Sequence, residues 1–308
     1  MTSDVGVIGL GVIGYGIASN LRKKLGSDTT LHVYDIAPAV TQRLIDEFGS
    51  YGKIEHVRDV YTIGDYCILK AEKNADRLII ECSTIEIEYT QDIGKTIMHA
   101  GVGTFLDATV SGGVWGAPDG TLTFMVGHPT PTEADTVGNR VWDILSHVGQ
   151  RDKIRFCGGL GMGQVAKIAH NYVTLCNNVT VTQGMALGLK YGIDKRVLWE
   201  CMTDGTANCW VMGLEQPVPG LVAEAPSSNG YRRAFGPELS LKDLGIAVRS
   251  AEKVGLDATV GKVAIEAFKP VAEDPRTTNL DHTALWLHVN GNIDAYIKEN
   301  GVWPGGTQ

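Results

Sequence analysis

The first half of the chain alternates short apolar runs with segments of helical periodicity. Apolar runs that predict strands lie at 5–9, 31–35, 78–82, 103–107 and 122–126, with a short one at 154–156. Apolar residues recur three and four positions apart in the stretches between them, at 12–25, 37–48, 86–100 and 131–147. That spacing is typical of helices with one buried face. Strands and helices that alternate in this order predict a doubly wound α/β sheet.

The pattern changes at the glycine-rich stretch 158–163, after which helical periodicity dominates and no convincing strand follows. We predict one long helix over 164–191, closed by Gly192. Further helices are predicted near 195–203, 208–215, 239–255, 258–271 and 280–298. The segment 217–237 is rich in Pro, Gly, Ser and Asn, and it predicts a long loop between helices.

Composition sets the class of protein. The length of 308 residues favours two domains, which we place at 1–160 and 161–308, the second all-helical and beginning with the long helix. The content of 44% hydrophobic and 20% charged residues is that of an ordinary globular protein. A net charge of −8 without a basic cluster argues against nucleic acid or an anionic membrane as the main partner.

No targeting or metal-binding pattern stands out. The first predicted strand begins at Val5, and no apolar stretch approaches the length of a membrane helix, so we expect a cytoplasmic protein. The six cysteines contain no C-x-x-C, which is typical of reduced intracellular thiols. His282 and His288 lie six positions apart, a spacing that does not place them on one helix face, so we expect no metal site.

The first strand passes directly into a G-x-G-x-x-G turn and a helix. The turn reads Gly9-Leu10-Gly11-Val12-Ile13-Gly14. In a dinucleotide site the first glycine allows the tight turn, the second lets the backbone approach a pyrophosphate, and the third lets the helix pack on the strand. Asp35 ends the second strand, where a carboxylate binds ribose hydroxyls and repels a 2′-phosphate. The pattern predicts NAD rather than NADP; the alternative is a glycine turn that binds no nucleotide.

A candidate proton-transfer pair follows the second glycine-rich stretch. Lys167 and Asn171 lie four positions apart, on one face of the predicted long helix and near its start. The helix dipole and partial burial both disfavour an ammonium there, so they lower the pKa of the lysine toward the range useful for proton transfer. Asn171 would orient the lysine or a substrate hydroxyl. Taken alone, a solvated lysine is the more common reading.

Further polar groups follow strand ends, where ligands of open α/β sheets bind. Ser111-Gly112-Gly113 offers a hydroxyl and backbone N–H groups, a cradle suited to a carboxylate, although Ser-Gly-Gly is equally an ordinary turn. Ser83 and Thr84 follow another strand and would place hydroxyls near a cofactor. Lys242-Asp243 is a charged pair within an otherwise apolar helical pattern, which core helices avoid unless the charges are paired or functional.

Six collinear segments resemble the β-hydroxyacid dehydrogenase family. They are 9–20 (GLGVIGYGIASN), 81–85 (ECSTI), 107–113 (DATVSGG), 120–127 (GTLTFMVG), 161–171 (GMGQVAKIAHN) and 239–245 (LSLKDLG). The agreement extends over nearly the whole chain and is more specific than any one motif. Segments 208–210, 217–220 and 226–231 are similar to the branch that acts on hydroxyisobutyrate rather than to the glyoxylate or tartronate semialdehyde reductases.

The resemblance implies a fold, a reaction and residue roles. It implies a Rossmann-type sheet followed by an all-α domain that joins subunits into a homodimer or homotetramer. It implies hydride transfer between NAD and a small β-hydroxy carboxylate, with 3-hydroxyisobutyrate as the leading substrate. Lys167 would be the general acid and base, and Asn171 its polar neighbour. Ser111, Gly112 and Gly113 would bind the carboxylate, and Lys242 would contact nicotinamide and substrate.

Two positions depart from the family pattern. Family members usually have Pro where this chain has Thr109, which relaxes a constraint on the cradle without removing its donors. The chain is also shorter between Asp35 and Ser83, where we expect a strand–helix unit to be shortened or absent. Residues 65–70 are a candidate for the missing strand, whereas residues 56–61 resemble the helix that follows the missing loop in the family pattern.

Two alternatives stay open at this stage. The same scaffold would suit a reductase of another semialdehyde, of glyoxylate or of an imine; the relatives that reduce C=N bonds typically lack the lysine, so Lys167 favours alcohol chemistry. A nucleotide-binding protein without catalysis would also carry the glycine motif. Tight NAD binding without turnover would identify it.

Overall fold

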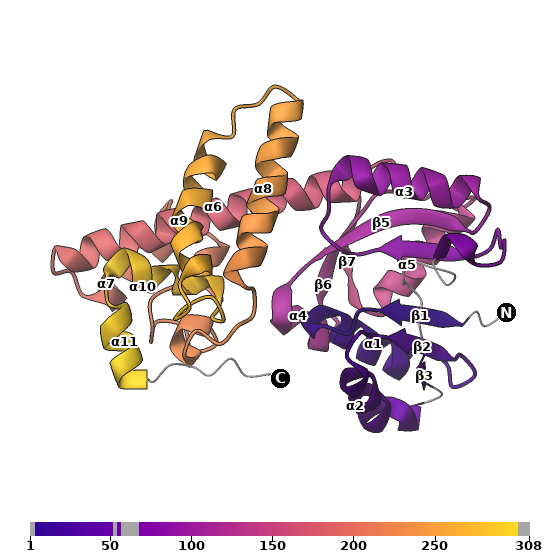
Figure 1. Ribbon diagram of the computed structural model, residues 1–308, viewed down its shortest axis with the longest axis horizontal. Helices are drawn as coiled ribbons and strands as arrows, with labels where there is room; N and C mark the ends of the chain where they lie inside the picture. Colours follow the sequence, from indigo (N-terminus) through magenta and orange to yellow (C-terminus); the bar gives the residue numbers. More distant parts are fainter. Residues whose placement is uncertain (1–3, 52–53, 57–67, 301–308) are drawn as a thin grey trace. The chain divides into compact units, whose positions relative to one another are not determined.

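A computed structural model describes residues 4–51, 54–56 and 68–300. The chain divides into two compact units, residues 1–167 and 168–308, which are described one at a time. The first unit is a Rossmann-like α/β unit and the second is mostly helical (Figure 1). This is the predicted fold class.

The first unit contains two sheets. Strands β1 (Val5–Ile8), β2 (Leu31–Tyr34) and β3 (Ile54–His56) are parallel in that order. The second sheet has the order β4-β5-β6-β7, with bounds Leu78–Glu81, Thr104–Ser111, Leu122–Val126 and Gly149–Phe156. β5 and β6 are antiparallel, whereas β4–β5 and β6–β7 are parallel.

Helices connect and cover these strands. They are α1 (Val12–Lys24), α2 (Pro38–Phe48), α3 (Ile87–His99), α4 (Gly113–Asp119) and α5 (Thr136–Ser146), with 3₁₀ turns at Gly49–Tyr51 and Ile68–Lys70. α3 lies along β5 (Figure 1). α1 packs on α4 so closely that a Cβ on Gly16 would lie 2.7 Å from the Cβ of Ala117. Glycine at position 16 is therefore what lets these two helices touch.

The first unit differs from the local expectations in several places. Residues 68–70 form a 3₁₀ turn instead of a strand, and His56 ends β3 instead of starting a helix; residues 57–67 lie outside the described part of the chain. The pattern also missed α4, because its sequence of Gly, Ala and Pro has no apolar periodicity. β5 and β7 both extend beyond the predicted strands.

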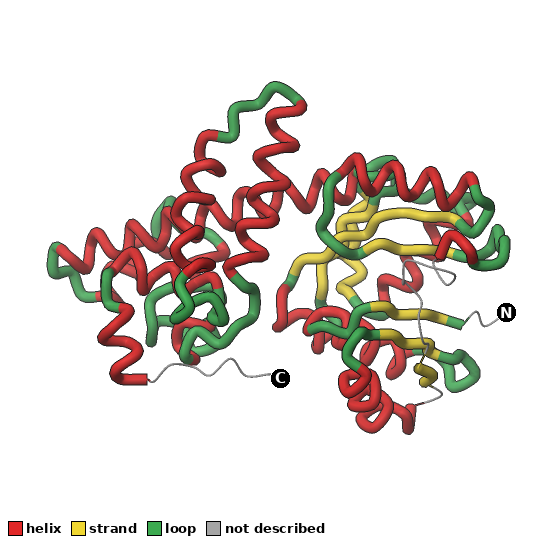
Figure 2. The backbone as a smooth tube through the Cα atoms, in the orientation of Figure 1, coloured by secondary structure: helices red, strands yellow, loops and turns green. Residues whose placement is uncertain are grey.

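The second unit is built around the continuation of one long helix. α6 (Met162–Lys190) begins in the first unit and is followed by α7 (Lys195–Thr203), α8 (Pro237–Lys253), α9 (Thr259–Glu273), α10 (Leu285–Asn290) and α11 (Ile293–Asn300). Short 3₁₀ turns lie at Trp210–Met212, Pro226–Asn229 and His282–Ala284. α8 and α9 pack side by side (Figure 2). The helix predicted over 208–215 is thus a single 3₁₀ turn, and the one over 280–298 is broken at Gly291, whose φ is +71°.

The core of the second unit combines large apolar side chains with a few buried ionisable ones. Met185, Leu244 and Phe268 are fully buried. His282 is also buried beside Glu215 and Asp281. Burial lowers the pKa of His282, but the two carboxylates outweigh it and raise that pKa to about 9. Among the described residues, no helix is both long and apolar enough to cross a membrane.

Candidate active site

The glycine turn after β1 has the geometry that its sequence predicts. Gly9 has a φ of +85°, which favours glycine. A Cβ on Gly14 would lie 1.9 Å from the carbonyl oxygen of Gly9, so only glycine lets α1 start this close to the turn. A Cβ on Gly11 would meet no atom within 4 Å, so the backbone here faces open space. Val12 and Ile13 form the first turn of α1.

Asp35 is tied to this glycine turn. Its Oδ2 accepts the Leu10 backbone N–H at 2.6 Å, and its Oδ1 accepts the Ala37 N–H at 2.8 Å. Each carboxylate oxygen keeps further acceptor capacity, which is what ribose hydroxyls require. The open face at Gly11, the tight helix start at Gly14 and the carboxylate at Asp35 therefore fit a dinucleotide.

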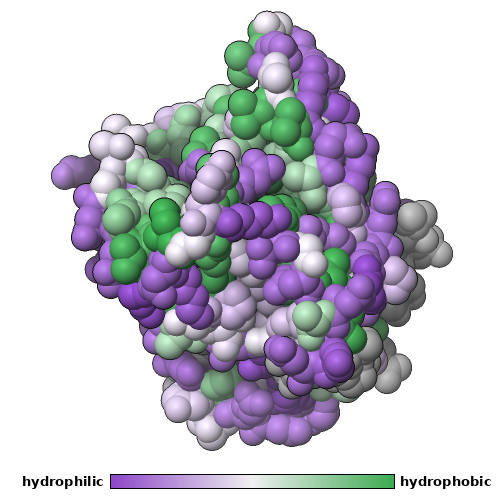
Figure 3. Space-filling view, turned by 90° about the vertical axis from the view of Figure 1, so that its left-hand side faces the viewer, coloured by the Kyte–Doolittle hydropathy of each residue, from purple (hydrophilic) through white to green (hydrophobic). Residues whose placement is uncertain are grey.

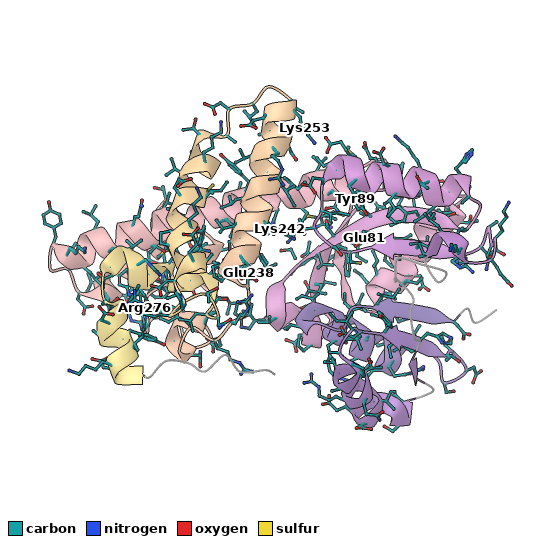
Figure 4. All side chains as sticks on the ribbon, viewed as in Figure 1. Glu81, Tyr89, Glu238, Lys242, Lys253 and Arg276 are labelled. Carbon is teal, nitrogen blue, oxygen red and sulfur yellow. The ribbon has the colours of Figure 1, made fainter. Side chains whose placement is uncertain are left out.

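The loop after β4 is bonded to the start of α6. The side chain of Gln164 bridges the two: its Nε2 donates to the Ser83 carbonyl at 2.7 Å and its Oε1 accepts the Ile85 N–H at 3.2 Å. Glu81, at the end of β4 (Figure 4), accepts the Ser83 N–H at 2.6 Å. Thr84 lies between the two residues that Gln164 holds. Burial, with a smaller contribution from Glu81, raises the pKa of the Cys82 thiol to about 12, so this cysteine is not a thiolate nucleophile.

Strand β5 also forms hydrogen bonds with the start of α6. Asp107 is fully buried, and its carboxylate accepts the Gly161 N–H at 2.7 Å and the Gln164 N–H at 2.8 Å. A carboxylate at this position satisfies orphan N–H groups and opposes the positive end of the helix dipole. The start of the helix that carries Lys167 is thereby fixed to β5.

The predicted carboxylate cradle lies at the carboxyl end of β5. Ser111 is the last residue of the strand, and Gly112 and Gly113 follow with φ values of +131° and +60°. A Cβ on Gly112 would lie 3.1 Å from Leu122, and one on Gly113 would lie 3.0 Å from the ring of Trp115. A side chain larger than a hydrogen atom would strain this loop at both positions, so its conformation requires glycine.

Lys167 and Asn171 share one face of α6, one turn apart, as the spacing predicts. Lys167 is half-buried and Asn171 is buried. The Nδ2 of Asn171 donates to the Oδ2 of Asp243 at 2.6 Å, and its Oδ1 lies 3.0 Å from His170 Nδ1. Because a carboxylate only accepts, Asp243 fixes which way the carboxamide of Asn171 is turned.

Lys242 and Asp243 form an ion pair on α8. The Lys242 Nζ lies 3.0 Å from the Asp243 Oδ1. The side chain of Asp243 is 3% exposed, whereas that of Lys242 is 46% exposed. Figure 4 labels Lys242 on α8. The buried carboxylate is thus shared between Asn171 and Lys242. This pairing explains the charges in an otherwise apolar helix.

The sequence pattern assigned no role to Asp107 and Gln164, and it marked Asp243 only as the charged neighbour of Lys242, without its contact to Asn171. Asp107 had one usable signal, since it is a charged residue at the end of an apolar run. Gln164 had none, because its two partners lie 79 and 81 positions away. Among the described residues, no group of three His, Cys, Asp or Glu side chains is arranged to hold a metal ion.

Two family models match the chain. Residues 52–159 match the NAD binding domain of 6-phosphogluconate dehydrogenase. Residues 161–288 match the model described as NAD-binding of NADP-dependent 3-hydroxyisobutyrate dehydrogenase.

Individual proteins are similar over most of their length. A 3-hydroxyisobutyrate dehydrogenase of Pseudomonas aeruginosa is 33% identical over 92% of this chain and 97% of its own. The human mitochondrial 3-hydroxyisobutyrate dehydrogenase is 31% identical over 87% of this chain and 81% of its own. The structure of Mycobacterium tuberculosis 3-hydroxyisobutyrate dehydrogenase with L-serine is 27% identical, has a TM-score of 0.77, and matches 94% of this chain and 99% of that one.

Proposed function

Since the chain belongs to the β-hydroxyacid dehydrogenase family, whose members similar to it include 3-hydroxyisobutyrate dehydrogenases, we propose that it oxidises 3-hydroxyisobutyrate to methylmalonate semialdehyde with NAD. Membership of this family indicates an oxidoreductase with domains that bind a nicotinamide dinucleotide. We assign cofactor binding to the first unit, which also holds Lys167 and the carboxylate cradle, and we assign further substrate contacts and the subunit contacts to the second.

One observation carries the proposal. The loop after β4 and the strand β5 are both bonded to the first turn of α6, through Gln164 and Asp107, and Lys167 lies on the next turn. Catalysis by a positioned base requires that base to be held against the groups that bind the substrate. This arrangement supports Lys167 as the base and Ser111-Gly112-Gly113 as the carboxylate cradle.

Each of these residues would have a separate role in the reaction. Lys167 Nζ takes the proton of the substrate hydroxyl during oxidation and returns it during reduction. Asn171, turned by Asp243, hydrogen-bonds the same oxygen. Ser111 and the backbone N–H groups of Gly112 and Gly113 bind the carboxylate, and Lys242 adds positive charge. The nicotinamide, when bound, accepts or supplies the hydride.

For the cofactor we propose NAD in preference to NADP. Gly9, Gly11 and Gly14 with Leu10, Val12 and Ile13 would hold the pyrophosphate, and Ser83 and Thr84 would approach the nicotinamide half. The support for NAD is Asp35, whose carboxylate already accepts two backbone N–H groups and so stays fixed at the end of β2. A fixed negative charge at this point repels a 2′-phosphate.

We expect NADH to form when the protein is mixed with NAD and racemic 3-hydroxyisobutyrate. With NADP in place of NAD, kcat/KM is expected to fall by about 10²-fold, the size of a repulsion of a few kcal/mol. The measurement is the absorbance of the reduced nicotinamide, with L-serine and glycerate as alternative substrates, since both are also β-hydroxy carboxylates.

The panel separates the possible failures. Turnover of L-serine or glycerate alone would reject hydroxyisobutyrate and keep the reaction class. Binding of NAD by calorimetry without turnover of any substrate would contradict the proposed enzyme and favour a nucleotide-binding protein. A preference for NADP would contradict only the role given to Asp35, and the proposed reaction would stand.

We also propose that the second unit joins two copies of the chain into a homodimer, or two dimers into a tetramer. The end of the α8–α9 hairpin carries four exposed apolar side chains, 53–79% accessible: Val254, Leu256, Val260 and Val263. Figure 3 shows apolar surface on this upper part of the helical unit. Clustered exposed apolar residues are typical of contact surfaces.

The double variant Leu256→Asp, Val260→Asp is expected to weaken self-association by about 10²-fold, because the interface would have to bury two unpaired carboxylates. Size-exclusion chromatography with light scattering measures the mass. Val197→Asp, at an exposed position of α7, is the control and should leave the mass unchanged. A wild-type chain that is monomeric at micromolar concentration would contradict the proposal.

A further inference from the structure

We propose that Thr109 is a positioning residue for the reaction: its hydroxyl holds the first turn of α6, and with it Lys167, in register with the Ser111-Gly112-Gly113 cradle. The inference rests on the proposed function for its catalytic consequence. The contact itself is independent of that function.

One face of β5 carries three polar side chains in a row. Asp107, Thr109 and Ser111 alternate along the strand and therefore point to the same face. Asp107 holds the start of α6, Ser111 begins the cradle, and Thr109 lies between them. A single extended strand thus sets the spacing between the helix that carries Lys167 and the loop that we assign to the carboxylate.

Thr109 contacts the helix at its first turn. The residue is fully buried, and its Oγ1 donates to the Gly163 carbonyl oxygen at 2.9 Å. A longer contact, 3.4 Å, joins the same hydroxyl to the Met125 carbonyl. A hydroxyl has one proton to donate, and the shorter contact is the better hydrogen bond.

The Gly163 carbonyl, which accepts this hydrogen bond, lies one helical turn before Lys167. In α-helical geometry, the carbonyl of Gly163 also accepts the backbone N–H of Lys167, four residues on. The hydroxyl of Thr109 and the backbone of Lys167 therefore share one acceptor. A movement of that carbonyl would move the residue that we assign to proton transfer.

Close packing at Gly163 prevents the first turn of α6 from moving toward strands β5 and β6. A Cβ there would lie 2.4 Å from the Met125 carbonyl oxygen and 2.7 Å from the Asp107 Oδ2, so the helix backbone already touches both strands. Close contact prevents the turn from moving inward, and the Thr109 hydrogen bond opposes movement outward.

Two substitutions test the hydroxyl directly. Thr109→Val keeps the shape and removes the donor, whereas Thr109→Ser keeps the donor. We expect Thr109→Val to lower kcat by about tenfold through misplacement of the base, with the KM for 3-hydroxyisobutyrate and the Kd for NAD unchanged. Thr109→Ser should retain wild-type kcat. Thr90→Val is the matched control, because Thr90 is also fully buried but its hydroxyl bonds the Glu86 carbonyl within its own helix.

Hydrogen–deuterium exchange measures the contact without reference to catalysis. The amides of residues 164–167 are expected to exchange faster in Thr109→Val than in the wild type, and to be unchanged in Thr109→Ser and Thr90→Val. Equal exchange in Thr109→Val and wild type would overturn the proposal, as would a Ser variant as impaired as the Val variant. If the wild type turns over none of the β-hydroxy acids, the proposed function fails, while the exchange data still decide whether Thr109 holds the turn.

Discussion

Replacing Lys167 with alanine is expected to lower kcat by about 10²–10⁴-fold, the usual contribution of a positioned general acid or base. The reason is that hydride transfer from an alcohol requires removal of the hydroxyl proton, and we assign that proton to Lys167 Nζ. The Kd for NAD should not change, because the groups that fit the dinucleotide lie in the glycine turn and at Asp35. Steady-state kinetics and calorimetry measure the two quantities.

Two further variants make the assignment of Lys167 specific. Lys167→Gln keeps a long polar side chain that cannot take up a proton, so it should lose as much activity as the alanine variant. Lys190→Ala, at an exposed position in the last turn of the same helix, should retain wild-type kcat. A Lys167→Gln variant with a tenth or more of wild-type kcat would show that the lysine binds or orients the substrate instead of moving its proton.

The parts of the site that could be predicted from the sequence are those that depend on neighbouring residues. Gly9 and Gly14 belong to one strand–turn–helix unit, and the sequence order alone places them against each other. The spacing of Lys167 and Asn171 is likewise a property of one helix. Each needs no knowledge of which distant segment packs nearby.

The contacts that organise the site join distant positions. Asp107 and Gly161 are 54 residues apart, Asn171 and Asp243 are 72 apart, and Ser83 and Gln164 are 81 apart. No local propensity specifies such pairs, since they depend on how whole elements pack. The sequence predicted which segments carry chemistry, and the fold decides which backbone groups their side chains bind.

Two local expectations failed for a different reason. The segment at 280–298 has helical periodicity throughout, but Gly291 adopts a left-handed φ and ends α10, so the periodic pattern continues across a break. The helix α4 is the opposite case: it is short, carries Pro118, and forms because it packs against α1. At Gly291, one backbone conformation overrides the helical periodicity. In α4, tertiary packing overrides the low helix propensity of the residues.

Replacing Asp107 with alanine is expected to reduce the free energy of unfolding by about 3–5 kcal/mol, because it leaves two buried N–H groups without an acceptor and removes a helix cap. The groups are those of Gly161 and Gln164, at 2.7 and 2.8 Å from the carboxylate. Asp107→Asn should cost about half as much, since its carbonyl oxygen satisfies one N–H while its amide group faces the other donor. Urea unfolding followed by circular dichroism measures both.

The control for Asp107 is Asp92→Asn, at an exposed position on α3, where the expected change is within about 0.5 kcal/mol. Comparing the free energies of unfolding of the wild type, Asp107→Asn and Asp107→Ala distinguishes the loss of hydrogen bonds from the loss of charge. If charge opposite the helix dipole were the main contribution, both variants would lose the same amount, because both remove it. If the two N–H groups are the main contribution, as the distances indicate, the asparagine variant must lie between the other two. An asparagine variant as stable as the wild type would mean that Asp107 does not hold the start of α6, and that Lys167 is positioned by Gln164 and Thr109 instead.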